Sequence, residues 1–216
     1  MALNKQHQPE TSPSSVSVEE PIQFDTLPHL TKRNLYNLAD AVKDVVPFEQ
    51  KSWIIRTSEL PSYPVVPKVV PKIINKVSNW ARNGSKFLYY LQVMGQPDLN
   101  AIRKAYSESR KRDRGTRAYA RLRKSSPSST PITEKPSPYF YVGSSSNISS
   151  RLNDHLGYGT YTTFALQLAH WAVGLDLKLK FICAKYRNSA QPDVFQALED
   201  TLWDQLQPMF GRKGRR

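Results

Sequence analysis

Arg151 and His155 are the two residues whose types and spacing are best suited to acting together on a phosphate. They lie four residues apart in 147–157, which Ser and Asn caps and Gly157 predict to be a helix. They border its apolar stripe, between core and solvent. There a guanidinium can neutralise phosphate charge, and an imidazole can move protons near neutral pH. The alternative interpretation is a solvated helix flank.

Three more side chains can take part in such chemistry. Glu199 lies on a helix predicted to begin at Pro192, and no carboxylate stands three or four residues away from it. The local carboxylate pair of a two-metal site is therefore missing. Tyr89 and Tyr141 lie on predicted strands, where their hydroxyl groups can orient or activate water. A phenol with an ordinary pKa of about 10 is a poor base unless its neighbours lower that pKa, and packing in the sheet is the alternative role.

These residues follow a known order along the chain. Tyr141-Val-Gly143, followed by Arg151 and His155, resembles the second motif of the GIY-YIG nuclease domain. Phe87-Leu-Tyr89 stands where the first motif would be, with Phe87 in place of its glycine. Glu199 stands where the family keeps its metal-binding glutamate. The resemblance covers roughly residues 85–211, and Gly211 falls where many members carry an Asn.

The resemblance implies an endonuclease that hydrolyses DNA phosphodiester bonds. One Mg²⁺ or Mn²⁺ would bind at Glu199. The catalytic residues would be Tyr89, Tyr141, Arg151, His155 and Glu199, with the tyrosines acting on water and Arg151 on the phosphate charge. The alternative is a non-catalytic nucleic-acid-binding protein that retains the fold.

The elements that must position these residues follow from periodicity and from helix-breaking residues. Strands are predicted at 87–93, 139–143 and 175–183, where the last shows alternation of period two. Helices are predicted over 147–156, over 162–171, and from Pro192 until Pro208. The expected fold is α/β of the α+β type, with a small three-stranded, mainly antiparallel sheet flanked by helices.

Composition divides the chain into three parts. Residues 1–24 are predicted to be a disordered tail, because they are nearly free of aromatic residues and cannot bury enough apolar surface. Residues 25–84 are predicted to be a helical N-terminal extension with a Pro-rich connector, and Gly84 would cap its second helix. Residues 85–216 would form the nuclease-like domain, which contains a long basic insert at 97–136.

The net charge of +13 is concentrated in two segments. Residues 99–124 contain ten basic and two acidic residues, and the last five residues contain four basic ones. Such local charge favours double-stranded DNA as the partner, and a solvated helix is the alternative. The predicted DNA-binding residues are Arg103, Lys104, Arg110, Lys111, Arg112, Arg114, Arg117, Arg121, Arg123, Arg212 and Lys213.

Several protein classes are disfavoured by composition. A single cysteine, Cys183, excludes a disulfide framework and a Cys-rich zinc module. The N-terminal residues lack the apolar core of a signal peptide, and no apolar run approaches the length of a membrane span. The sequence therefore predicts a soluble cytoplasmic protein with no membrane partner.

Overall fold

The computed structural model describes residues 27–61, 71–82, 86–122, 137–187 and 191–214. The chain divides into Met1–Asn37 and Leu38–Arg216, and the sheet and the candidate site belong to the second unit. Helix α1 spans Leu27–Lys43. The predicted tail, most of the Pro-rich connector and the Gly84 cap lie outside the described residues.

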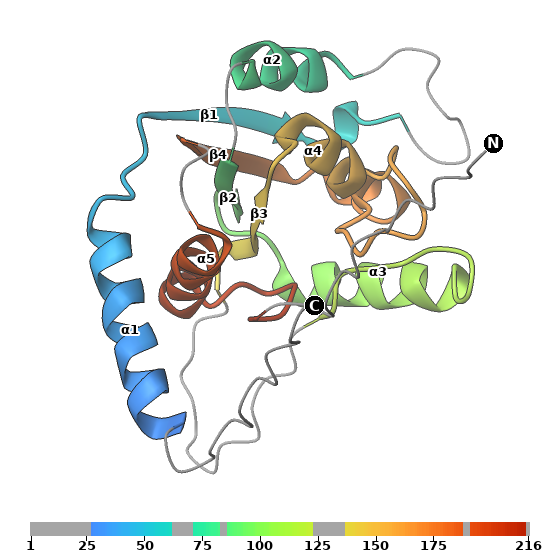
Figure 1. Ribbon diagram of the computed structural model, residues 1–216. Helices are drawn as coiled ribbons and strands as arrows, with labels where there is room; N and C mark the ends of the chain where they lie inside the picture. Colours follow the sequence, from blue (N-terminus) through green and yellow to red (C-terminus); the bar gives the residue numbers. More distant parts are fainter. Residues whose placement is uncertain (1–26, 62–70, 83–85, 123–136, 188–190, 215–216) are drawn as a thin grey trace, which may run out of the picture. The chain divides into compact units, whose positions relative to one another are not determined.

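The second unit is of the α+β class and is built on a four-stranded antiparallel sheet of order β1-β4-β2-β3 (Figure 1). Strands β2 (Lys86–Val93), β3 (Tyr139–Ser145) and β4 (Lys178–Tyr186) are the three that the sequence predicts. The prediction of a three-stranded sheet is wrong because β1 (Glu49–Arg56), from the segment expected to be helical, adds an edge strand.

β1 carries little of the pattern that identifies a strand. Its first four residues are exposed, and only Trp53 and Ile55 are buried. The strand is fixed by pairing with β4 along its whole length, from Glu49 opposite Lys185 to Arg56 opposite Lys178. This partner lies far away in the sequence, so local periodicity gives no sign of it.

The two faces of the sheet carry different layers. On β2, Tyr89 and its alternate neighbours join the main core, which also contains residues of α4 (Ile148–Leu156) and α2 (Lys72–Ala81). Leu88 belongs to a second cluster that includes residues of α5 (Pro192–Leu206). α5, the helix that carries Glu199, also packs along β3, on the side of this strand opposite to α4 (Figure 1).

The helix predicted over 162–171 is absent. The segment is irregular and contains one 3-10 turn, Leu168–His170, and a second turn, Val173–Leu175, follows it. A separate 3-10 turn, Thr57–Glu59, follows β1. Gln167 has a φ of 58°, in the left-handed region, and this interrupts any right-handed helix. The helices predicted at 147–156 and from Pro192 are confirmed, and Asn147 and Gly157 cap α4 as expected.

The basic insert is folded into the domain over its described part. Helix α3 (Leu99–Arg112) begins at the Asp98 cap and buries Ile102 and Tyr106 in the main core. Beyond α3, Tyr119 pairs with Ala165, and Leu122 pairs with Phe210. Residues 123–136 lie outside the described part, and they include the predicted DNA contact Arg123.

Candidate active site

Tyr89, Tyr141, Arg151 and His155 come together on the face of the sheet that α4 covers. The β2–β3 register places Tyr89 opposite Gly143, and Tyr141 opposite Leu91, so the two tyrosine rings share one face of the sheet. Their ring centroids lie 6.2 Å apart, with the rings nearly parallel. Tyr90, the next residue along β2, points to the other face and contacts the Tyr139 ring.

Arg151 is the centre of the cluster. Its Nε donates to Tyr89 Oη at 3.0 Å, and an Nη donates to Tyr141 Oη at 2.9 Å and to the Phe164 carbonyl at 3.0 Å. Its side chain is only 15% exposed, which contradicts the alternative of a solvated flank. Burial acts to lower the pKa of Arg151, but the two phenols outweigh this effect and raise it, so the guanidinium stays charged.

His155 is fully buried, and its hydrogen-bond partners determine its tautomer. The backbone N–H of Leu166 donates to Nδ1 at 3.2 Å, so the neutral ring must carry its proton on Nε2. Nε2 lies 2.9 Å from Tyr89 Oη and therefore donates to it. This assignment follows from the hydrogen bonds, and it makes His155 a donor to the tyrosine rather than a base toward it.

Tyr89 Oη accepts both the imidazole N–H and the guanidinium N–H. A hydroxyl oxygen can accept two hydrogen bonds and donate one, so the proton of Tyr89 remains available as a donor. Burial raises the pKa of Tyr89 above its ordinary value, and the positive charge of Arg151 offsets this only in part. The tyrosine therefore stays neutral near pH 7, and without a further positive charge it is a donor rather than a base.

Gly143 is required by the closeness of the two tyrosines. A Cβ added there would lie 2.7 Å from Tyr89 Oη and 2.8 Å from Tyr141 Cε1. Because any larger residue would displace both rings, the glycine of Tyr141-Val-Gly143 has a steric cause. Gly211 lies against the other edge of Tyr141, where its Cβ would be 3.2 Å from Cε2, and its φ is 104°. The resemblance predicts an Asn at this position, but the residue here is a glycine, so residue 211 has no side chain to lie against this edge of the Tyr141 ring.

Glu199 reaches the neighbourhood of the cluster from the opposite side of β3. Its carboxylate accepts a hydrogen bond from Ser144 Oγ, and its negative charge helps to raise the pKa of Tyr89. Ser144 adjoins Gly143 on the edge strand and also lines an open pocket beside α5, together with Lys86 and Gln196. Ser144 is not among the residues predicted from the sequence, although its position directly after Tyr-Val-Gly was a signal that could have identified it.

The predicted DNA-binding residues differ in how the fold uses them. Arg103 and Arg117 are half-buried, and Arg117 donates to the Gln167 side chain at 2.9 Å. Arg112 is tied to Asp113 at 2.9 Å, and Lys213 pairs with Asp204. The remaining ones in the described part are exposed: Lys104, Arg110, Lys111, Arg114, Arg121 and Arg212.

Comparison with known proteins finds no matching family model, no similar curated protein and no similar solved structure. The likeness to the GIY-YIG domain stays a prediction, based on the residues of this chain. Within the described residues, no group of three or more His, Cys, Asp or Glu side chains is placed to hold a metal ion. No described helix has both the length and the apolar character needed to cross a bilayer.

Proposed function

We propose that this protein is a metal-dependent endonuclease that hydrolyses DNA phosphodiester bonds at the cluster of Tyr89, Tyr141, Arg151 and His155, with Glu199 as the metal ligand. The observation that carries the proposal is the bonded network around Arg151. It joins, from three separate elements, four of the five residues that the resemblance selects. Packing alone does not require a charged guanidinium between two buried phenols.

Glu199 fits the binding of a single hard cation. Mg²⁺ keeps several of its waters and is commonly held by one or two carboxylates together with substrate phosphates. The half-buried Glu199 carboxylate supplies one such oxygen ligand, and the Ser144 hydroxyl fixes its orientation. When bound, the cation would supply Lewis-acid polarisation of the scissile phosphate.

The other residues would neutralise charge on the phosphate and donate protons. Arg151 remains charged and keeps part of its side chain exposed, so it can neutralise charge that develops on the phosphate oxygens. Tyr89 would donate its remaining proton to a phosphate oxygen or to the attacking water. His155 holds Tyr89 in the donor orientation, because its Nε2–H occupies one of the two acceptor positions of the tyrosine oxygen.

The second candidate is a nucleic-acid-binding protein that retains this fold without catalysis. It is favoured by the burial of the polar cluster, since Tyr89 is 1% exposed and His155 is 0% exposed. Under this alternative the cluster would stabilise the domain, and Glu199 would have no role toward phosphate.

Supercoiled plasmid incubated with the purified protein, with and without Mg²⁺, distinguishes the two functions. We expect Mg²⁺-dependent nicking by the wild type and its loss in Glu199→Gln, which keeps the shape of the side chain and removes the anionic ligand. Asp200→Asn, at the adjacent position on α5, is the matched control and should keep activity. Equal nicking by wild type and Glu199→Gln would overturn the assignment of the metal ligand.

A further inference from the structure

Residues 164–166 form a short irregular segment that is bridged to the basic insert through Ala165 and Tyr119. The backbone of this segment makes four hydrogen bonds to groups elsewhere in the domain. The Phe164 carbonyl accepts from Arg151 at 3.0 Å, and the Leu166 N–H donates to His155 Nδ1 at 3.2 Å. On its other side, the Ala165 carbonyl accepts from the Ala120 N–H at 2.8 Å. The segment therefore joins the candidate site directly to the insert.

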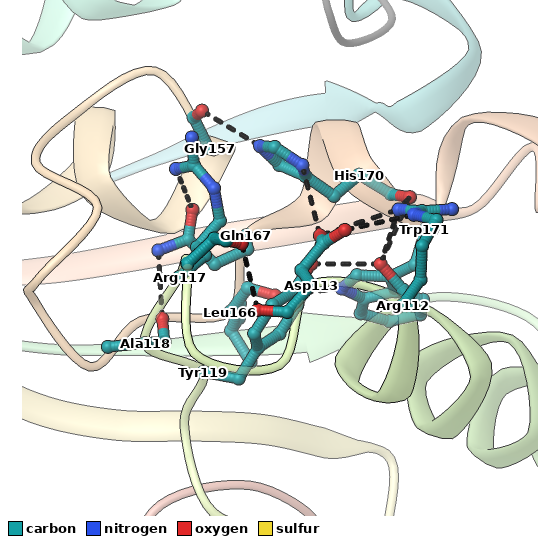
Figure 2. Close-up of polar contacts among 12 residues, drawn as sticks. Arg112, Asp113, Arg117, Ala118, Tyr119, Gly157, Leu166, Gln167, His170 and Trp171 are labelled. Atoms are coloured by element: carbon teal, nitrogen blue, oxygen red, sulfur yellow. Dashed lines mark hydrogen bonds and ion pairs between the residues drawn. The ribbon is translucent and has the colours of Figure 1, made fainter.

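Trp171 holds the remaining polar group of Leu166. Its indole Nε1–H donates to the Leu166 carbonyl at 2.7 Å, and the indole is almost wholly buried (Figure 2). Both backbone polar groups of Leu166 thus have fixed partners, the His155 ring on one side and the Trp171 indole on the other. If Leu166 moved, its backbone N–H would no longer face His155 Nδ1, and the hydrogen bond that keeps the proton on Nε2 would be lost.

Gln167 anchors the same segment to the insert, and its amide is fully bonded although the residue is only 1% exposed. Its Nε2 donates to the carbonyls of Ala118 and Thr163, at 3.1 and 3.4 Å, and its Oε1 accepts from Arg117 (Figure 2). The residue adopts a left-handed φ of 58°, which non-glycine residues seldom do. Such a conformation persists where its surroundings fix it, and it often marks a functional constraint.

We propose that Trp171 and Gln167 are positioning residues: they hold the 164–166 backbone so that His155 keeps its proton on Nε2 and Arg151 keeps its orientation toward both tyrosines. The basic insert would then have a role in the site that is separate from contact with phosphates. This inference rests on the proposed function for its effect on cleavage, and on the geometry alone for its effect on the His155 tautomer.

The test removes the indole N–H with as little change in shape as possible. Incorporation of β-(3-benzothienyl)alanine at position 171 keeps the bicyclic ring and replaces N–H with sulfur. Gln167→Met is the second variant, since it keeps the length of the side chain and removes the amide. Trp80→Phe is the matched control, because the Trp80 indole also donates a hydrogen bond, but to Glu49 on β1. Unfolding curves establish that each variant is folded.

The quantity to measure is the tautomer of His155, by ¹⁵N NMR on histidine-labelled protein, because a merely structural role of Trp171 and Gln167 would leave that tautomer unchanged. His155→Gln identifies its signals among the four histidines of the chain. We expect one Nε2–H form in the wild type and in Trp80→Phe, and a mixture with the Nδ1–H form in the two site variants. We also expect their single-turnover cleavage rate to fall by about tenfold or more, with DNA affinity in EDTA unchanged within about twofold.

Two results would overturn the proposal: an Nδ1–H form in the wild type, or variants with the wild-type tautomer and cleavage rate. Failure of the proposed function looks different, because the tautomer would then change in the variants while the wild type showed no Mg²⁺-dependent nicking at all. In that case Trp171 and Gln167 would still be shown to position His155, but the proposed role of His155 in cleavage would be wrong.

Discussion

At the scale of single residues, the candidate site depends on the sharing of one hydroxyl oxygen. Tyr89 Oη accepts from both His155 and Arg151, and the Tyr89 and His155 side chains are buried. Hydrogen bonds to a charged donor contribute more than neutral ones, and a buried donor without a partner costs about 1–3 kcal/mol. The cluster is therefore sensitive to removal of any one member.

Tyr89→Phe should lower the free energy of unfolding by about 1–3 kcal/mol, because it leaves the His155 Nε2–H and an Arg151 N–H without an acceptor. It should also abolish cleavage. Tyr90→Phe is the matched control, and we expect a change within about 0.5 kcal/mol and normal activity. Urea unfolding and the plasmid assay measure both variants. The opposite ranking would mean that Tyr90 is the residue facing the substrate.

Gly143→Ala tests the close approach of the tyrosines to β3. The added methyl group would meet Tyr89 Oη and Tyr141 Cε1 within 2.8 Å, so both rings must move and Arg151 would lose at least one acceptor. We expect a loss of about 1–3 kcal/mol in the free energy of unfolding. Gly174→Ala is the control, since a Cβ at Gly174 meets no atom within 4 Å. Equal stability of the two variants would contradict the steric reason for this glycine.

At the scale of elements, a second polar cluster, in which Tyr119 and His170 are buried, joins α3 to the 157–171 segment (Figure 2). Asp113 accepts from Arg112 at 2.9 Å and from Tyr119 at 2.5 Å, and its carboxylate lies 3.6 Å from His170 Nδ1. His170 Nε2 lies 3.3 Å from the Gly157 carbonyl at the end of α4. Ser109 and Arg112 also donate to the His170 carbonyl, at 3.3 and 3.1 Å, and these two hydrogen bonds fix the end of α3 against the segment that contacts the candidate site.

This cluster should make stability depend on pH through His170. Burial lowers the pKa of His170 below its ordinary value of 6.5, and Arg117 and Arg112 act in the same direction, against Gly157 and Asp113. The unfolded chain then binds more protons in mild acid. The contribution of His170 to stability is therefore full above about pH 6.5, and it is lost as pH falls toward the lowered pKa of the folded state.

His170→Gln should remove this part of the acid sensitivity. We expect the free energy of unfolding to fall less between pH 7.5 and pH 5.5 in the variant than in the wild type, as measured by urea titration at each pH. Because only the difference between two pH values is compared, a uniform loss of stability in the variant does not matter. A steeper fall in the variant would mean that Asp113 raises the pKa of His170 instead.

At the scale of the whole molecule, the exposed cations of the insert should supply affinity for DNA that does not depend on its sequence. We expect the triple change Arg110→Gln, Lys111→Gln and Arg114→Gln to flatten the slope of log K against log salt by up to about 0.9 per lost phosphate contact. Arg112 is left unchanged because it is bonded to Asp113 and to the His170 carbonyl. Binding is measured without metal, by fluorescence anisotropy over a series of salt concentrations.

The control for this experiment removes the same charge elsewhere. Lys51, Lys72 and Lys76 are exposed on β1 and α2, and their change to Gln should leave the slope nearly unaltered. Equal slopes for both triple variants and the wild type would show that the insert faces solvent or another protein. The binding surface would then have to lie near Arg212 and the Arg151 helix.

The sequence by itself was enough to predict features that depend on neighbours along the chain. The capping residues and apolar spacing of 147–157 predicted α4, and Pro192 predicted the start of α5. Strands β2, β3 and β4 followed from runs of β-forming residues. The i, i+4 spacing placed Arg151 and His155 side by side on this helix.

Only the tertiary structure decided the features whose partners are distant. β1 is a strand because β4 pairs with it, and 164–167 is not helical because its backbone bonds Arg151, His155 and the insert instead of itself. The same holds for the proton of His155, which Leu166 fixes, and for the pKa of Tyr89, which burial raises although Arg151 lies beside it. Hydrogen-bond partners and burial are properties of the packed chain, and local periodicity does not contain them.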